Sequence, residues 1–238
     1  MNHHGMTLGC GCAACAGRSI PRRGFLAAGA ALAVGGGLAL SSTAARAQST
    51  LSPDAALAQM MAGNARFVAH DLTSFNEDLN LLRAGTVAKQ EPFAAVLSCA
   101  DSRVPAELIF DQTIGHLFIT RVAGNVATTE VIASLEYGVA VLGVRAIMVL
   151  AHQGCGAVKA AVGGGAVPGQ ISALYAPLRA AVDQGHHDYE LTARLNAKIQ
   201  AELLSTASPV LAETIQHGNL KIVAAYYALD TGKVSLLD

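Results

Sequence analysis

The chain contains no tryptophan, and only 5% of its residues are aromatic and 14% charged. Its lysines and arginines do not cluster among aromatic side chains, which is the pattern that neutralises phosphates and stacks on bases. The sequence therefore predicts no nucleic-acid partner. Of its 238 residues, 52% are hydrophobic, which is enough to bury one sizeable core.

The first 47 residues predict an export signal. An arginine pair at 22–23 precedes an apolar run over 25–40, and small residues ending in Ala-Arg-Ala follow. A basic region, an apolar region and an A-x-A cleavage sequence in this order are typical of a signal peptide, and the arginine pair resembles a twin-arginine signal. We expect cleavage after residue 47, a domain over 48–238 and a periplasmic location. The alternative is a permanent membrane anchor, although the run is shorter than the roughly 20 residues that a span needs.

Removal of this signal leaves a mildly acidic chain with few cysteines. The first 47 residues hold four arginines and no acid, so 12 basic and 17 acidic side chains remain, a formal net charge of −5. This charge favours a soluble protein without membrane attachment. Only Cys99 and Cys155 remain of five cysteines. In an oxidising compartment such a pair ordinarily indicates a disulfide, but the neighbouring residues favour another use.

Both cysteines lie close behind apolar runs that predict buried strands. Cys99 follows the run 93–98 in "SCADSRVPAELIF", and the run 146–151 leads into His152 and Cys155 in "VLAHQGCGAVKAA". Side chains at the carboxyl ends of parallel strands face the ligand crevice. Two cysteines and a histidine suit Zn²⁺, and three protein ligands with an open fourth position are typical of catalytic zinc. Each residue taken alone is also compatible with simple core packing.

These segments together resemble the β-class carbonic anhydrases over roughly residues 55–238. The motifs "CADSRVPAELIF", "RVAGN", "SLEYGVAVLGV" and "HQGCGAVKA" carry the resemblance, and His152 lies 53 residues after Cys99. The resemblance implies a zinc lyase that interconverts CO₂ and bicarbonate, with one Zn²⁺ per chain held by Cys99, His152 and Cys155. It implies attack on CO₂ by zinc-bound hydroxide, because a metal can lower the pKa of bound water from about 15.7 to about 7. It also implies a homodimer or homotetramer.

The resemblance gives Asp101 and Arg103 roles beside the metal. Asp101 would accept the hydrogen bond of zinc-bound hydroxide, or bind zinc as a fourth ligand when the site is closed. Arg103 would pair with Asp101 and keep it ionised. Val96 stands where one subgroup has a tryptophan of a regulatory bicarbonate site, so we expect an open site without that regulation. The alternative for the pair is a helix N-cap with a surface ion pair.

Four further positions match the substrate pocket of the plant-type subgroup. Gln90 matches a glutamine whose amide donates a hydrogen bond to the substrate, and Phe118 and Tyr137 match aromatic wall positions. The backbone N–H of Gly156 is a candidate donor at a helix N-terminus. Core packing is the alternative for Phe118 and Tyr137.

Strands interleaved with amphipathic helices predict an α/β fold, with a central, mainly parallel β-sheet flanked by helices. The expected strands are 93–98, 116–121, 146–151 and 220–227. The expected helices are 105–110, 128–142, 169–183 and 188–206. An N-terminal helical arm is expected over 52–70, and by resemblance it would pack on a partner subunit.

Two rival functions stay open. The same fold and ligand set can be adapted to hydrolyse CS₂ or COS, where access to zinc decides the substrate. Alternatively, the cluster is a non-catalytic zinc or redox module, which would need neither Asp101 nor Arg103.

Overall fold

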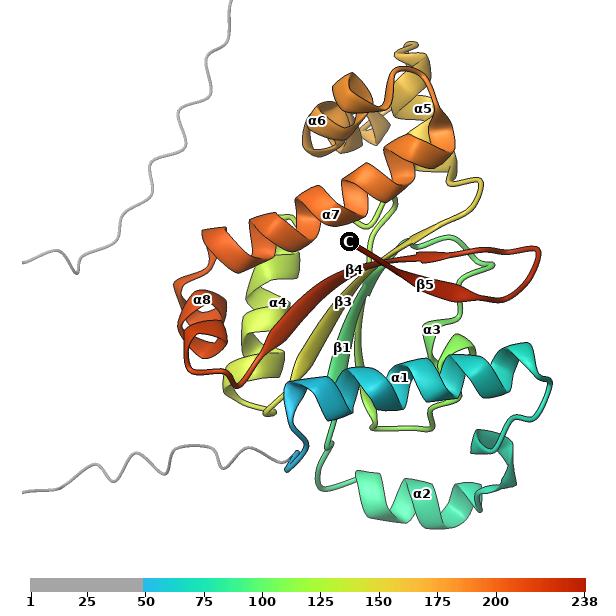
Figure 1. The fold of residues 1–238 in the computed structure, drawn as a ribbon, viewed down its shortest axis with the longest axis vertical. Helices are drawn as coiled ribbons and strands as arrows, with labels where there is room; N and C mark the ends of the chain where they lie inside the picture. Colours follow the sequence, from blue (N-terminus) through green and yellow to red (C-terminus); the bar gives the residue numbers. More distant parts are fainter. Residues whose placement is uncertain (1–48) are drawn as a thin grey trace, which may run out of the picture. The chain divides into compact units, whose positions relative to one another are not determined.

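Five strands form one sheet in the order β2-β1-β3-β4-β5 (Figure 1). The structure is a computed structural model that describes residues 49–238, so the expected signal peptide and its cleavage site lie outside the described residues. The strands are β1 Ala94–Ser98, β2 Leu117–Arg121, β3 Ala146–His152, β4 Lys221–Tyr227 and β5 Val234–Leu237. The first four pair in parallel and β5 pairs antiparallel with β4, which confirms the predicted mainly parallel α/β sheet.

The central strands β1 and β3 are largely apolar along their whole length, which matches their position between helices on both faces of the sheet. Every residue of "AAVLS" in β1 and of "AIMVLAH" in β3 is buried. A strand buried on both faces loses the apolar–polar alternation of a half-exposed strand. Alternate residues of β1 therefore enter two separate cores: Leu97 joins the core under α7, and Val96 joins the core under α1.

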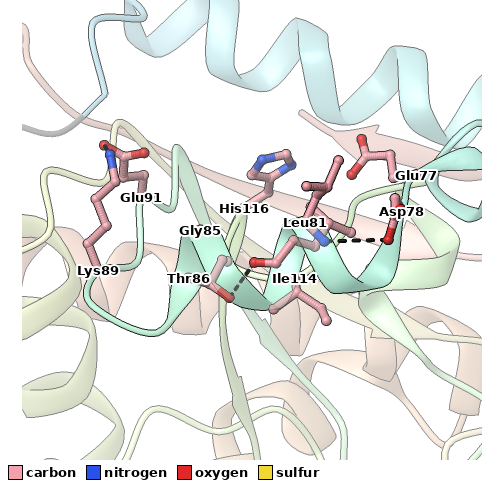
Figure 2. Close-up of a pocket in the computed structure, with 11 residues that line it drawn as sticks. Glu77, Asp78, Leu81, Gly85, Thr86, Lys89, Glu91, Ile114 and His116 are labelled. Carbon is pink, nitrogen blue, oxygen red and sulfur yellow. Dashed lines mark hydrogen bonds and ion pairs between the residues drawn. The ribbon is translucent and has the colours of Figure 1, made fainter.

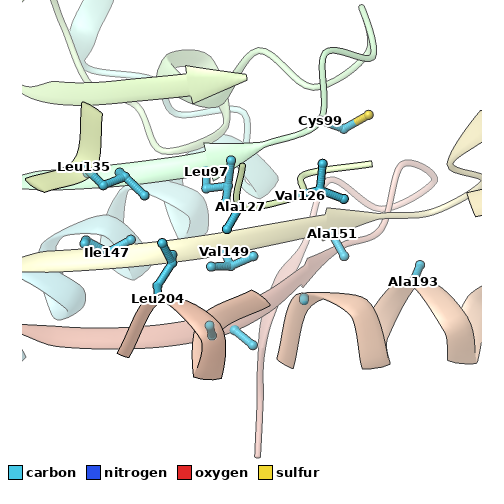
Figure 3. Packing of buried hydrophobic residues seen from close by; sticks show 14 of the residues in the cluster. Leu97, Cys99, Val126, Ala127, Leu135, Ile147, Val149, Ala151, Ala193 and Leu204 are labelled. Atoms are coloured by element: carbon cyan, nitrogen blue, oxygen red, sulfur yellow. The ribbon is translucent and has the colours of Figure 1, made fainter. Parts of the chain in front are cut away.

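The helices form two layers around this sheet (Figure 1). They are α1 Pro53–Val68, α2 Leu79–Thr86, α3 Ala106–Ile109, α4 Thr129–Ala140, α5 Gly156–Gly163, α6 Tyr175–Gly185, α7 Tyr189–Ala207 and α8 Pro209–Gln216, with short 3₁₀ turns at Ser74–Asn76 and Ile171–Leu174. Helices α4 to α8 contribute to the core that contains Leu97. Figure 3 shows the part of this core that lies between β3 and α7. Helices α1 and α3 cover the opposite face.

Helix α1 packs on the sheet of its own subunit. Ser52 caps its amino end by accepting a hydrogen bond from the backbone N–H of Ala55, and Pro53 occupies the first turn. Gly63 lets the helix approach closely, since a Cβ there would lie 1.8 Å from the carbonyl oxygen of Phe110. The buried face of α1 contacts α3, β1 and β3. The expected packing of this helix on a partner subunit stays a prediction.

Helix α2 lies on the surface, and Leu79 and Leu81 are 63% and 73% exposed. Within residues 49–238, no helix has the combination of length and apolar character that crossing a bilayer requires.

Candidate metal and catalytic centre

The three predicted metal ligands meet at the carboxyl edge of the sheet. Cys99 directly follows β1, His152 ends the neighbouring strand β3, and Cys155 directly precedes α5. Because β1 and β3 are parallel and adjacent, their carboxyl ends bring the motifs together. The ligand atoms of the three residues all lie within 4.8 Å of one another, and all three residues are buried.

The spacing of the two sulfurs fits a shared metal ion. The Sγ atoms of Cys99 and Cys155 are 3.9 Å apart, and both thiols are free. A disulfide would require about 2.05 Å. Two thiolates that each lie about 2.3 Å from a tetrahedral zinc ion would be about 3.8 Å apart. The observed separation therefore matches metal ligation and not a disulfide.

His152 is oriented so that one ring nitrogen remains available. Its Nδ1 lies 3.0 Å from the carbonyl oxygen of Gln153, and because that oxygen can only accept, Nδ1 carries the proton. Its Nε2 is buried and has no hydrogen-bond partner within the described part of the chain. A buried nitrogen with a free lone pair is costly unless it binds something, and a backbone carbonyl on the other nitrogen is typical of metal-ligating histidines.

The contact between the two thiols shifts their pKa values in opposite directions. The hydrogen bond from Cys155 lowers the pKa of Cys99 against the opposing effect of burial, and the N–H of Gly124 lowers it further. The same hydrogen bond to Cys99, together with burial, raises the pKa of Cys155. Cysteine binds a metal as the thiolate, so metal binding here is expected to release protons.

Asp101 lies beside the cluster and is held by Arg103. The guanidinium of Arg103 donates from Nε to Oδ1 at 2.9 Å and from Nη2 to Oδ2 at 2.8 Å, and its backbone N–H donates to Oδ1 at 3.0 Å. These contacts hold the pKa of the Asp101 carboxyl well below its usual range. Oδ2 is 3.9 Å from Nε2 of His152. Asp101 thus pairs with Arg103, the arrangement expected of an open site.

Arg121, which was not predicted from the sequence, binds the backbone of the loop that carries Cys99 and Asp101. It ends β2, and its guanidinium donates to the carbonyl oxygens of Cys99, at 3.0 Å, and Asp101, at 2.5 Å. The sequence feature that could have identified Arg121 is a basic residue at the carboxyl end of a largely apolar strand.

The predicted substrate-pocket residues are divided between two ends of the sheet. Gly156 is exposed and follows Cys155 directly, so it lies at the cluster. Phe118 is in register with Ala95 near the amino end of β1, and the ring of Tyr137 is 6.3 Å from that of Phe118. Gln90 precedes β1, and it lines a surface cavity of about 500 Å³ together with Tyr137. Within one subunit, therefore, these three residues do not meet the metal ligands.

A second cavity also lies away from the cluster. It measures about 510 Å³ and lies between α2 and the loop before β2 (Figure 2). Glu77, Asp78, Leu81 and His116 are among the residues that line it. His116 precedes the amino end of β2, whereas the metal ligands lie at the carboxyl edge.

Comparisons with known proteins agree on one family. A family model described as carbonic anhydrase matches residues 94–234. Carbonic anhydrase 2 of Mycobacterium tuberculosis is 37% identical over 195 residues, covering 79% of this chain and 94% of that protein. The carbonic anhydrase of Mycolicibacterium smegmatis is 36% identical over 196 residues, covering 78% and 93% respectively.

Two solved structures are similar in fold and sequence. The Coccomyxa β-carbonic anhydrase in complex with acetazolamide has a TM-score of 0.60 and 26% identity, covering 67% of this chain and 78% of that chain. A β-carbonic anhydrase of Aspergillus fumigatus has a TM-score of 0.62 and 26% identity, covering 78% and 90%. The segment matched by the family model contains the whole Cys-His-Cys cluster and the Asp101–Arg103 pair.

Proposed function

Because this chain belongs to the carbonic anhydrase family, in its β class, we propose that it hydrates CO₂ reversibly with one zinc ion per chain, bound by Cys99, His152 and Cys155. The observation that carries this proposal is the buried ligand cluster with its unpartnered histidine nitrogen. Two thiolates and one neutral imidazole suit zinc and leave a fourth coordination position for a water molecule. Bound zinc would lower the pKa of such a water from about 15.7 to about 7 and so supply a nucleophile at neutral pH.

Asp101 orients the attacking oxygen. Its carboxylate is ionised and lies next to the cluster, where it accepts a hydrogen bond from the nucleophile and directs a lone pair toward CO₂. Arg103 keeps the carboxylate charged and in this position. The backbone N–H of Gly156, at the amino end of α5, donates a hydrogen bond to an oxygen of the substrate.

The remaining pocket residues are proposed to act across a subunit interface. Phe118 and Tyr137 adjoin one another at the amino end of the strands, and Tyr137 is 48% exposed. Exposed apolar side chains surround this region, among them Val87 and Val141. In a homodimer or homotetramer, Gln90, Phe118 and Tyr137 of one copy would complete the substrate pocket of another.

A location in the periplasm is proposed from the signal-like leader alone, and cell fractionation tests it.

Zinc content and substrate choice test the proposal directly. The purified protein is expected to contain about one zinc per chain and to turn over CO₂ far faster than CS₂ or COS. Preferential hydrolysis of the sulfur gases would reassign the site to that chemistry. Full zinc occupancy with no turnover of any of these gases would instead indicate a non-catalytic zinc site.

A further inference from the structure

Two buried amide side chains on α7 face the loop that follows β2. Asn196 and Gln200 are 0% and 1% exposed and lie one turn apart on the helix. The other buried residues of α7 are apolar except for Thr192; they include Ala193, Ala197 and Leu204. Burying an amide among apolar side chains is unfavourable unless its hydrogen bonds are made, so the contacts of this pair explain its position.

Both amides bind backbone groups of the loop over 122–128. Nδ2 of Asn196 donates to the carbonyl oxygen of Gly124 at 2.8 Å. Oε1 of Gln200 accepts from the N–H of Ala127 at 2.8 Å, and its Nε2 donates to Oδ1 of Asn196 at 3.1 Å. The two side chains therefore act as one linked unit that holds the loop at two points.

The same loop donates a hydrogen bond to a proposed metal ligand. The N–H of Gly124 points at the sulfur of Cys99, with the nitrogen 3.3 Å from Sγ. Gly124 has a φ of +78°, a conformation that favours glycine. The N–H of Val122 donates to the carbonyl oxygen of Ser98, which ties the start of the loop to β1. The amides of α7 hold the carbonyl of Gly124 and the N–H of Ala127, so the loop is held on both sides of the Gly124 N–H.

We propose that Asn196 and Gln200 are positioning residues of the metal centre, which hold Gly124 so that its N–H donates to the Cys99 thiolate. This inference rests on the proposed role of Cys99 as a metal ligand. A hydrogen bond to a thiolate withdraws charge from the sulfur and fixes its position, so the pair controls how tightly Cys99 binds the metal and how electrophilic the metal remains. Substitution of residues that hydrogen-bond to metal ligands typically lowers metal affinity or activity by about 10- to 100-fold.

The test is a titration of metal-free protein with Co²⁺, whose sulfur-to-metal charge-transfer absorption reports on thiolate ligands. Asn196→Leu replaces the amide by an apolar side chain of similar volume and removes the bond to Gly124. Thr192→Val is the matched control, because Thr192 is 0% exposed on the same helix. Its hydroxyl donates to the carbonyl oxygen of Asp188 at 2.6 Å, and within residues 49–238 it makes no hydrogen bond to the loop over 122–128.

We expect Asn196→Leu to bind Co²⁺ about tenfold more weakly than the unmodified protein, with the charge-transfer band moved to longer wavelength. Thr192→Val should change neither quantity. If Asn196→Leu fails to fold by circular dichroism, Asn196→Asp is used instead, since it keeps the side-chain shape but cannot donate to Gly124.

Folded variants at Asn196 with unchanged Co²⁺ affinity and an unchanged band would overturn the positioning role while leaving the metal site intact. A different failure belongs to the proposed function: if the unmodified protein itself shows no thiolate charge-transfer band, Cys99 is not a metal ligand. The two results are distinguishable because only the second affects the unmodified protein.

Discussion

At the scale of single residues, the centre depends on groups that hold other groups in place. The carbonyl of Gln153 selects the tautomer of His152, and Arg103 holds both oxygens of Asp101. Arg121 adds two bonds to the backbone on either side of Ala100. A carboxylate that is held by a fixed arginine stays ionised at neutral pH and does not turn toward a nearby cation.

Arg103→Ala should slow CO₂ hydration at neutral pH by at least about tenfold, although the variant keeps all three proposed metal ligands. Loss of the guanidinium raises the pKa of Asp101 toward its ordinary value and frees the carboxylate to approach the metal position. Initial rates measured across pH, with metal content determined for each sample, check this. Arg103→Lys is the control, because lysine restores the charge but not the bidentate contact, and should recover only part of the rate. Equal rates for all three proteins would contradict the role given to Arg103.

At the scale of elements, an ion pair joins α1 to the end of α3. The side chain of Asp111 is fully buried and accepts hydrogen bonds from Arg66, Thr73 and the N–H of Ser74. Burial raises the pKa of Asp111, but these bonds outweigh that effect and hold the pKa below its usual range. A carboxyl whose folded pKa is depressed contributes stability above its unfolded pKa, near 3.9, and loses it as the pH falls further.

Asp111→Asn should lower the free energy of unfolding at pH 7 by about 2 kcal/mol, the contribution of hydrogen bonds to a charged group. Asparagine suits the test because Asp111 has a φ of +47°, which asparagine tolerates. Urea denaturation at pH 7 and at about pH 3.5 measures the effect, and the difference between the two proteins should shrink at the lower pH. A difference that is the same at both pH values would show that the charge of Asp111 is not the cause.

The sequence predicted the elements whose signal is local. Strands β1 and β3 were predicted because continuous apolar runs identify buried parallel strands, and the motif spacing brought Cys99, His152 and Cys155 together. Helix α2 and strand β5 were not predicted, because α2 buries no residue and β5 has only four residues. Asn196 was missed for another reason: it meets Gly124, 72 residues away in the sequence, and no helical pattern encodes such a contact.

At the scale of the whole molecule, one subunit does not assemble every predicted pocket residue at one place. Gly156 lies with the proposed metal ligands, whereas Gln90 and Tyr137 line a cavity near the amino ends of the strands. The proposed homo-oligomer resolves this separation, because a second copy can present its own Gln90 and Tyr137 to the cluster of the first.

Subunit complementation tests that arrangement. Cys99→Ser removes a metal ligand, and Gln90→Ala removes a substrate contact, so each variant alone should hydrate CO₂ poorly. Co-expressed, the two should form mixed oligomers in which one site combines an intact metal cluster with an intact glutamine, and part of the activity should return. Activity that stays at the sum of the separate variants, in oligomers proven to be mixed by mass, would place Gln90 outside the shared pocket.

The most direct measurement is stopped-flow CO₂ hydration by the purified protein, with zinc quantified per chain and Asp101→Ala measured beside it. The proposed mechanism predicts about one zinc per chain in both proteins and fast hydration by the unmodified protein. It predicts a loss of about 100-fold or more in the variant, the scale of a lost proton-accepting group. Full zinc occupancy with no hydration between about pH 6.5 and 9, a range around the zinc-water pKa near 7, would contradict it.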